Sequence, residues 1–349
     1  METIVYKVED NHLPSKVIEK IQETFRQGGL VAFPTETVYG LGANALEETA
    51  AIKIYEAKGR PSDNPLIIHI ANIEDLSYIT EDISEKARIL AEHFWPGPLT
   101  LIMKKSVNVP KAVTGGLDTV AVRIPDSFIA LEVIKAGGGY VAAPSANTAG
   151  RPSPTAASHV LEDLNGKIDV IVDGGTVQIG LESTIVDMTE EPPVILRPGY
   201  ISEEMLEEVI GTVVLDKALE STGKDIKPKA PGMKYKHYAP KGNLVIVEGE
   251  NLAVIEKINQ LVKEKEAQGF KVAVIGTEET VKYYQCSQIT NIGSRIKEEN
   301  IAQQLYKILR EFDGANVEYM YSESFYTPKM GQAIMNRLLK AAGYNVIHV

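Results

Sequence analysis

The sequence predicts an α/β protein with two domains, and three observations carry this prediction. Its length of 349 residues suits two domains of ordinary size better than one. Short apolar runs alternate with amphipathic segments of helical period along most of the chain. A segment rich in Pro, Gly and Lys, residues 221–243, interrupts this alternation and is typical of an interdomain linker. We therefore expect domains at 1–215 and 243–349, joined by a basic linker at 216–242.

The part before the linker predicts a mixed, twisted sheet with helices. Residues 48–58 have helical period until Pro61 prevents continuation, and residues 84–94 form a second such segment that ends at WPGP. The apolar runs with strand length and composition are 29–33, 66–70, 99–103, 119–124, 140–144, 169–173, 183–187 and 194–198. Interleaved helices and strands indicate one α/β domain.

The part after the linker alternates more regularly. The predicted strands are 243–249, 271–276, 317–322 and 344–349, and the predicted helices are 251–269, 301–312 and 331–343. This order predicts a smaller, doubly wound (Rossmann-like) domain. It contains neither G-x-G-x-x-G nor G-x-x-x-x-G-K-[ST], so we interpret it as an accessory or regulatory domain.

Composition excludes several classes of protein. An apolar share of 44% with 24% charged residues is ordinary for a globular chain, and no apolar run approaches the roughly 18 residues of a membrane helix. The N-terminus lacks the basic-then-apolar order of a signal peptide. Cys286 is the single cysteine, which excludes an internal disulfide and a Cys-based zinc site. We expect a cytoplasmic protein with no membrane association.

The net charge of −11 is unevenly distributed. Residues 1–223 carry 18 Lys/Arg against 33 Asp/Glu, whereas residues 224–241 carry six lysines against one aspartate. A basic run is usually a solvated linker. Tyr235 and Tyr238 within it favour a second interpretation, a lid that covers a bound nucleotide and excludes water.

Polar residues of the first part gather where strands end. FPTETVYGLG (33–42) offers two hydroxyls, a carboxylate and glycines that permit close backbone approach, although Thr before Glu is also a common helix start. KGRPSDNPL (58–66) places Lys58 and Arg60 at a helix C-terminus, which the helix dipole favours. Because Asn64 follows in a Pro-bounded turn, the cluster also has the donors of a phosphate site.

Three further segments add cations and hydroxyls. Arg123 interrupts an apolar strand and therefore needs either an internal carboxylate or a ligand anion. ESTIVD and ILRPG contribute Ser183, Thr184 and Arg197. The loop APSANTAGRPSPT (143–155) is the densest in polar groups, with Ser145, Asn147, Thr148, Arg151, Ser153 and Thr155.

The absence of several catalytic motifs from the sequence reduces the number of reaction types that it could support. No histidine stands in a G-x-S-x-G or Cys–His setting, and no H-E-x-x-H or acidic cluster predicts a tightly held metal. The remaining polar residues are suited to positioning and neutralising anions. Enzymes catalyse phosphoryl and nucleotidyl transfer mostly in this way. Mg²⁺ carried in by a nucleotide would fit such a site.

In this order, the motifs resemble the YrdC/Sua5 family, the L-threonylcarbamoyladenylate synthases of tRNA modification. The resemblance rests on PTETVYGLGANA, KGRPSDNPLIIHI, FWPGPLTLIM, VAVRIPD, PSANTAGRPSPT, ESTIVD and ILRPG. It covers about residues 20–205, and the linker PGMKYKHYAP with the trailing domain is similar to the longer Sua5 branch. A YrdC-like fold is therefore implied for the first domain.

The resemblance implies a reaction and a set of residues. L-Threonine, bicarbonate and ATP would give threonylcarbamoyl-AMP and pyrophosphate, and a second protein system would transfer the threonylcarbamoyl group to adenosine 37 of tRNA. Direct tRNA binding would be weak. Lys58, Arg60 and Arg123 are the implied catalytic residues. The implied threonine site is Thr37, His69, Arg123, Ala143 and Ser183. The implied ATP site is Lys58, Arg60, Asn64, Thr119, Ser145, Asn147, Ser153, Arg197, Tyr235 and Tyr238.

Two alternatives are weighed against this reading. A carbamoyltransferase that uses a carbamoyl adenylate has a YrdC-like domain, but its usual fusion to Cys-rich zinc fingers is excluded by the single cysteine. A double-stranded RNA-binding module is disfavoured by the acidic balance of residues 1–223, because affinity for RNA rests on many phosphate contacts.

Overall fold

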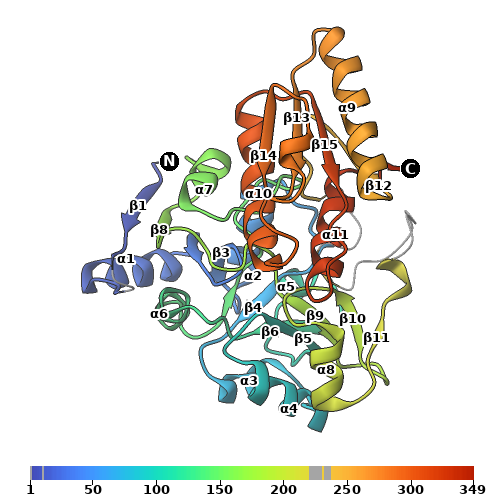
Figure 1. Cartoon of the computed structure of the whole chain (residues 1–349). Helices are drawn as coiled ribbons and strands as arrows, with labels where there is room; N and C mark the ends of the chain where they lie inside the picture. Colours follow the sequence, from blue (N-terminus) through green and yellow to red (C-terminus); the bar gives the residue numbers. More distant parts are fainter. Residues whose placement is uncertain (1, 10–11, 220–229, 232–236) are drawn as a thin grey trace. The chain divides into compact units, whose positions relative to one another are not determined.

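The computed structural model describes residues 2–9, 12–219, 230–231 and 237–349, which form two compact units (Figure 1). The first unit comprises Met1–Ala149 and Ser153–Lys234, and the second comprises Gly150–Pro152 and Tyr235–Val349. The second unit therefore includes three residues from the middle of the loop 143–155. Most of the expected linker and lid lies outside the described residues, so the domain boundaries and the lid stay predictions.

The first unit contains, within its described residues, one mixed sheet of eleven strands. Their order is β1-β8-β2-β3-β7-β4-β6-β5-β9-β10-β11, with both parallel and antiparallel neighbours. The strands are β1 (Ile4–Lys7), β2 (Val31–Pro34), β3 (Tyr39–Asn44), β4 (Ile67–His69), β5 (Leu99–Lys104), β6 (Thr119–Arg123), β7 (Val141–Ala142), β8 (Val170–Asp173), β9 (Thr184–Asp187), β10 (Val194–Arg197) and β11 (Val214–Leu215). The predicted mixed sheet is confirmed.

Helices begin and end where the sequence supplies caps. Ser84 and Ser202 each accept a hydrogen bond from a backbone N–H of the first turn of α4 and α8, and α2 ends at Gly59, whose φ of 61° is left-handed. The helices of the first unit are α1 (Ser15–Arg26), α2 (Glu48–Lys58), α3 (Leu76–Ile79), α4 (Glu85–Phe94), α5 (Lys111–Thr114), α6 (Phe128–Ala136), α7 (Ala157–Leu164) and α8 (Glu203–Ile210), with 3-10 turns η1 (Ile73–Asp75) and η2 (Lys217–Leu219).

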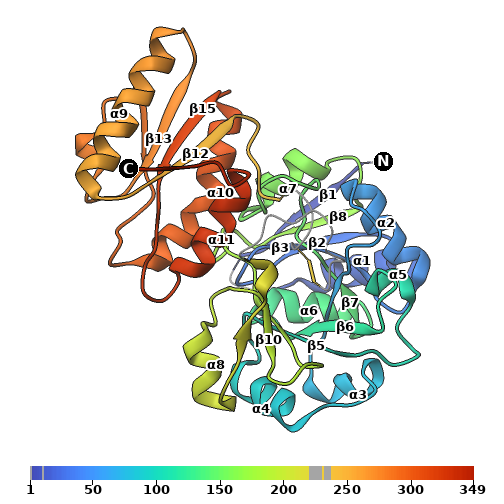
Figure 2. The same ribbon diagram turned by 90° about the vertical axis from the view of Figure 1, so that its right-hand side faces the viewer.

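The period of two along each strand sends side chains into separate cores. On β2, Ala32 packs into the cluster that holds α2, α4 and α7, whereas Val31 and Phe33 pack into the cluster that holds α1 and α6. This part of the sheet is therefore covered on both faces, as Figure 2 shows from a second side.

A third cluster positions the polar residues singled out in the sequence. It consists of Ile67, Ile102, Ala121, Ile185, Leu196 and Ala230. Because strand residues two apart share a face, His69 lies on the face of Ile67, Thr100 on that of Ile102 and Arg123 on that of Ala121. These polar side chains therefore lie on one face of neighbouring strands, where Ala230 is fully buried.

The second unit is a five-stranded, all-parallel sheet in the order β14-β13-β15-β12-β16. Its strands are β12 (Asn243–Glu248), β13 (Val272–Gly276), β14 (Gln288–Asn291), β15 (Tyr319–Glu323) and β16 (Val346–His348). Its helices are α9 (Asn251–Ala267), α10 (Glu298–Gly314) and α11 (Gly331–Ala341), with the 3-10 turn η3 (Val281–Tyr283). Figure 2 shows α9 on one face of this sheet and α10 and α11 on the other, which confirms the doubly wound prediction.

Strand β3 was not among the predicted strands, because residues 33–42 were interpreted as a polar segment after the first strand or as a helix start. Its glycines are required by packing: a Cβ at Gly42 would lie 2.7 Å from Val141 Cγ1 and 2.8 Å from Phe33 Cε1. Across the described residues, no helix is both long and apolar enough to span a lipid bilayer.

Candidate active site

The connection between β2 and β3 is a tight hydroxyl-bonded turn. Thr35 Oγ1 accepts hydrogen bonds from the backbone N–H groups of Thr37 (3.1 Å) and Val38 (3.2 Å). It also lies 2.8 Å from Thr37 Oγ1. The carbonyl of Glu36 accepts a bond from Ile179 N at 2.8 Å, which ties the turn to the loop that follows β8. The turn therefore fixes the directions of the Glu36 and Thr37 side chains.

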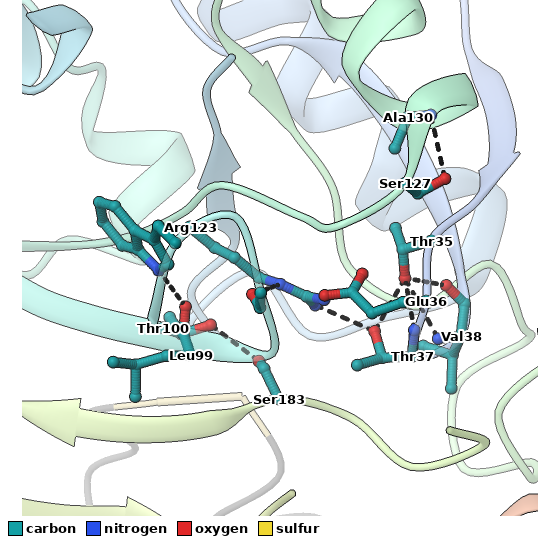
Figure 3. Close-up of polar contacts among 12 residues, drawn as sticks. Thr35, Glu36, Thr37, Val38, Leu99, Thr100, Arg123, Ser127, Ala130 and Ser183 are labelled. Atoms are coloured by element: carbon teal, nitrogen blue, oxygen red, sulfur yellow. Dashed lines mark hydrogen bonds and ion pairs between the residues drawn. The ribbon is translucent and has the colours of Figure 1, made fainter. Parts of the chain in front are cut away.

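Arg123, the last residue of β6, points at this turn (Figure 3). Its Nε donates to the carbonyl of Gly97 (3.1 Å) and its Nη1 donates to Thr37 Oγ1 (3.0 Å). Its Nη2 lies 2.6 Å from Glu36 Oε1, and both side chains are 4% exposed. Of the two partners that the sequence left open, the structure contains the internal carboxylate.

The pair between Arg123 and Glu36 is an ion pair without a hydrogen bond. The distance is short, but Arg123 Nη2 and both carboxylate oxygens of Glu36 are buried and have no hydrogen-bond partner in the described part of the chain. The contact therefore compensates charge without supplying a hydrogen bond. Glu36 and Arg123 can therefore each form further hydrogen bonds.

His69 ends β4 and lies opposite Arg123 in the parallel ladder. Burial, and then the charge of Arg123, lower the pKa of His69 to about 3. Its Nδ1 lies 3.2 Å from the carbonyl of Ile67. The imidazole is therefore neutral at physiological pH and contributes polarity without charge.

Ser183 lies immediately before β9 and contacts residues of the same face. Its Oγ lies 2.7 Å from Thr100 Oγ1, and Arg197 binds the same residue twice, through Nε to the carbonyl (3.0 Å) and Nη2 to the hydroxyl (3.0 Å). Arg197 is 5% exposed. The predicted Ser183 and Arg197 are therefore in direct contact.

Lys58 and the loop 143–155 form a second group. Lys58, 2% exposed at the end of α2, donates through Nζ to the carbonyl of Ser145 and to that of Asn147 (2.6 Å). Ser145 Oγ donates to Asn147 Oδ1 at 2.6 Å. The structure thus brings Lys58 into contact with a loop that lies far from it in the sequence.

Arg60 folds back over its own turn. Its Nε lies 3.3 Å from the carbonyl of Asn64 and its Nη2 lies 2.9 Å from that of Pro65. Asn64 is 2% exposed, and its Oδ1 is a buried acceptor without a hydrogen-bond partner among the described residues. The turn is therefore stabilised by the cation itself.

The other predicted residues are placed as follows. Ser153 Oγ donates to Glu182 Oε1 at 2.5 Å, Thr119 begins β6, and the Ala143 amide donates to the carbonyl of Ile67 at 2.9 Å. Tyr238 belongs to the second unit, where its ring stacks on Tyr306 at 5.2 Å. Tyr235 lies outside the described residues.

Sequence reasoning did not assign a role to Glu36, Thr100 or Glu182. Thr100 could have been predicted to face the site, because in the run LTLIM it alternates with leucines that face the core. Glu36 stood in a noted motif, but a pattern of residues cannot show which carboxylate will be buried. No group of three or more His, Cys, Asp or Glu among the described residues could hold a metal ion.

These buried cations, neutral hydroxyls and carboxylates carry the charges that a small zwitterion beside a polyanion would need. Comparison with known proteins agrees with this arrangement. Residues 23–199 match the Sua5/YciO/YrdC family model, described as telomere recombination, and residues 201–343 match the model described as the threonylcarbamoyl-AMP synthase C-terminal domain. The chain belongs to the Sua5/YciO/YrdC family.

Members of this family with curated names match nearly the whole chain. A threonylcarbamoyl-AMP synthase of Pyrococcus abyssi is 51% identical over 93% of both chains, and one of Bacillus subtilis is 50% identical over 92% of both. The crystal structure of P. abyssi Sua5 complexed with L-threonine superposes with a TM-score of 0.93 and 47% identity, covering both chains completely. The chain is thus of the long, two-domain Sua5 type.

Proposed function

We propose that this chain is an L-threonylcarbamoyladenylate synthase, a nucleotidyltransferase that acts in the synthesis of the t6A modification of tRNA. The observation that carries the proposal is the full-length similarity, at 50–51% identity, to relatives named for this activity. The buried cluster around Arg123 supports the proposal, because it gathers a cation, hydroxyls and a neutral imidazole.

L-Threonine is assigned to the face of β4, β6 and β9. Arg123 would bind its carboxylate, since a guanidinium presents two parallel donors to a carboxylate. The hydroxyls of Thr37 and Ser183 and the neutral His69 would contact the rest of the molecule, and Ala143 would line the site. The single charged donor in this set is Arg123, so we assign it a catalytic as well as a binding role.

ATP is assigned to the group around Lys58 and the loop 143–155. Lys58, Arg60 and Arg197 donate hydrogen bonds to protein carbonyls and hydroxyls. When the nucleotide binds, they would exchange these acceptors for phosphate oxygens. The remaining contacts are assigned to Asn64, Thr119, Ser145, Asn147, Ser153, Tyr235 and Tyr238. Lys58 and Arg60 would stabilise the charge that develops on the phosphates.

The reaction joins three substrates. The threonine amine combines with bicarbonate to give a carbamate, one carbamate oxygen attacks the α-phosphorus of ATP, and the bond to pyrophosphate breaks. The protein would contribute by holding carbamate and α-phosphate in contact and by neutralising charge.

Several finer assignments belong to the same proposal. Mg²⁺ would arrive with ATP and take its oxygen ligands mainly from phosphates and water, a mode typical of this ion. Bicarbonate is the source of the carbamoyl carbon. The product would pass to tRNA threonylcarbamoyl-transfer proteins in the cytoplasm, and direct contact with tRNA would be weak.

The proposal is tested by omitting each substrate in turn. Purified protein should release pyrophosphate and form an AMP-linked product only when ATP, L-threonine and bicarbonate are all present. Turnover that does not require threonine would contradict the proposal.

A further inference from the structure

Glu36 is a buried carboxylate that the fold leaves without hydrogen bonds. Glu36 is 5% exposed, and neither of its carboxylate oxygens accepts a hydrogen bond from the part of the chain that the structure describes. The other buried carboxylates of the first unit have donors: Asp163 accepts the amide of Thr148, Glu182 the hydroxyl of Ser153, and Asp187 the hydroxyl of Thr189. Among the described carboxylates, Glu36 alone has oxygens that are buried and lack a hydrogen-bond partner.

Such a group is costly, so it calls for an explanation. A buried polar group without a hydrogen-bond partner destabilises the fold, and it does so more strongly when it is charged. Its neighbour Arg123 offsets the charge but does not supply a hydrogen bond. The turn that carries Glu36 is held by Thr35 and Ile179, so the carboxylate is placed by a rigid backbone (Figure 3).

Space that the protein does not fill adjoins this residue. Glu36 lines a cavity of about 260 Å³, together with Pro34, Thr35, Ser127 and Gly174. At about 30 Å³ for each water, this volume holds several waters or a small organic molecule. The cavity adjoins the turn that carries Glu36, whereas the carboxylate oxygens themselves are buried.

We propose that Glu36 receives the ammonium group of L-threonine and removes a proton from it, as the general base of carbamate formation. This inference rests on the proposed function. Threonine is a zwitterion, and its two charged groups are attached to one carbon. The adjacent Arg123 and Glu36 present the two complementary charges, and the ammonium would give Glu36 the hydrogen bonds that it lacks.

The proton transfer is necessary because an α-ammonium group has no lone pair and predominates near neutral pH. Glu36 takes one proton from the ammonium and leaves a neutral amine. Protonated Glu36 returns that proton to bicarbonate, which breaks down to CO₂ and water. The amine nitrogen forms a bond to the carbon of CO₂, and the second N–H proton leaves to solvent, giving the carbamate with Glu36 restored.

Glu323 of the second unit provides a matched control. It is 2% exposed and pairs with Arg295 at 2.5 Å, but it also accepts hydrogen bonds from the hydroxyls of Thr280 and Tyr284. Glu36→Gln and Glu323→Gln therefore make the same chemical change at two buried glutamates that are each paired with an arginine.

The experiment measures pyrophosphate release by both full-length variants against the wild type. Glu36→Gln should lower kcat/KM for threonine about 10²–10⁴-fold, the usual contribution of a general base. Its residual rate should rise about tenfold per pH unit above neutrality, as the free amine becomes more abundant, whereas the wild-type rate should not. Glu323→Gln should retain the wild-type rate and pH profile.

A second measurement needs no variant. 3-Hydroxybutanoate has the carboxylate and hydroxyl of threonine but no amine, and as a competitor it should bind the wild type about 10–150-fold more weakly than threonine. Equal binding, or a Glu36→Gln variant with the wild-type rate and pH profile, would overturn the inference. A wild type without threonine-dependent turnover would instead overturn the proposed function.

Discussion

Each of the two units contains a buried glutamate that is paired with an arginine, and the two glutamates are bonded differently. Glu323 has donors on both oxygens, from Arg295 on one and from Thr280 and Tyr284 on the other. Burial and the nearby Glu323 raise the pKa of Tyr284, so its hydroxyl stays protonated and keeps donating. Glu36 has the ion pair with Arg123 alone.

This difference separates a structural pair from a candidate binding pair. A buried salt bridge repays its desolvation only when further hydrogen bonds satisfy the remaining lone pairs. The pair between Arg295 and Glu323 meets that condition at its carboxylate, although Arg295 Nε itself is buried and unbonded. The pair between Arg123 and Glu36 does not meet it, and this is expected where a ligand completes the bonding.

Removal of the arginine should give the largest effects and should separate the pairs most clearly. Arg123→Ala leaves Glu36 as an uncompensated buried charge, so we expect a loss of about 3–5 kcal/mol in the free energy of unfolding, together with loss of threonine binding. Arg295→Ala should cost less, since Glu323 keeps two hydroxyl donors and the Arg295 side chain is 29% exposed. Urea unfolding and calorimetric titration with threonine measure both quantities; equal losses would remove the distinction.

A cation that is already hydrogen-bonded to the protein can still bind a nucleotide phosphate. Substitution of Arg60 tests this. Arg60→Ala should remove charge-assisted bonds worth about 1.5–3 kcal/mol, or about 10–150-fold in kcat/KM for ATP. The exposed Arg88→Ala is the control. If a folded Arg60→Ala variant has unchanged kinetics, then Arg60 serves only its own turn.

Serine should replace threonine with a moderate loss. The two amino acids present the same charges to Arg123 and Glu36 and differ by one methyl group, which a pocket distinguishes by about 1–3 kcal/mol. The ratio of kcat/KM values in competition measures the difference. Discrimination far above roughly 200-fold would mean that the side chain is recognised by more than packing.

His69 gives the smallest effect at neutral pH, because its contribution appears only as the pH is lowered. Its folded-state pKa of about 3 lies below the ordinary 6.5, so the unfolded chain binds more protons between these values. Stability is therefore full above about pH 6.5 and falls as pH decreases, by up to about 1.4 kcal/mol per pH unit. Urea midpoints should show a flatter profile in His69→Asn than in the wild type, and the exposed His12→Asn should leave the slope unchanged.

How much the sequence could predict differs between fold and site. Strands such as β6 and β9 and the helix α2 were predictable because apolar period and Pro boundaries are local features. Strand β3 was not, since Gly40 and Gly42 suggest a loop unless the neighbours that require glycine are known.

The site could be predicted as a set of residue types but not as a set of contacts. Arg123 in an apolar strand predicted a buried charge. Its partner Glu36 lies far away in the sequence, so no repeating pattern of residues could identify it. The engagement of Lys58 with the carbonyls of Ser145 and Asn147 likewise depends on the folded loop. Long-range pairing is a property of topology, which a local pattern does not contain.

The most direct test of the central claim is a crystal structure of this chain with L-threonine. We predict that the ammonium group lies within hydrogen-bond distance of a Glu36 carboxylate oxygen and that the threonine carboxylate contacts Arg123. A threonine whose ammonium lies elsewhere, with Glu36 still facing Arg123 alone, would contradict the claim that unsatisfied buried groups mark the substrate site.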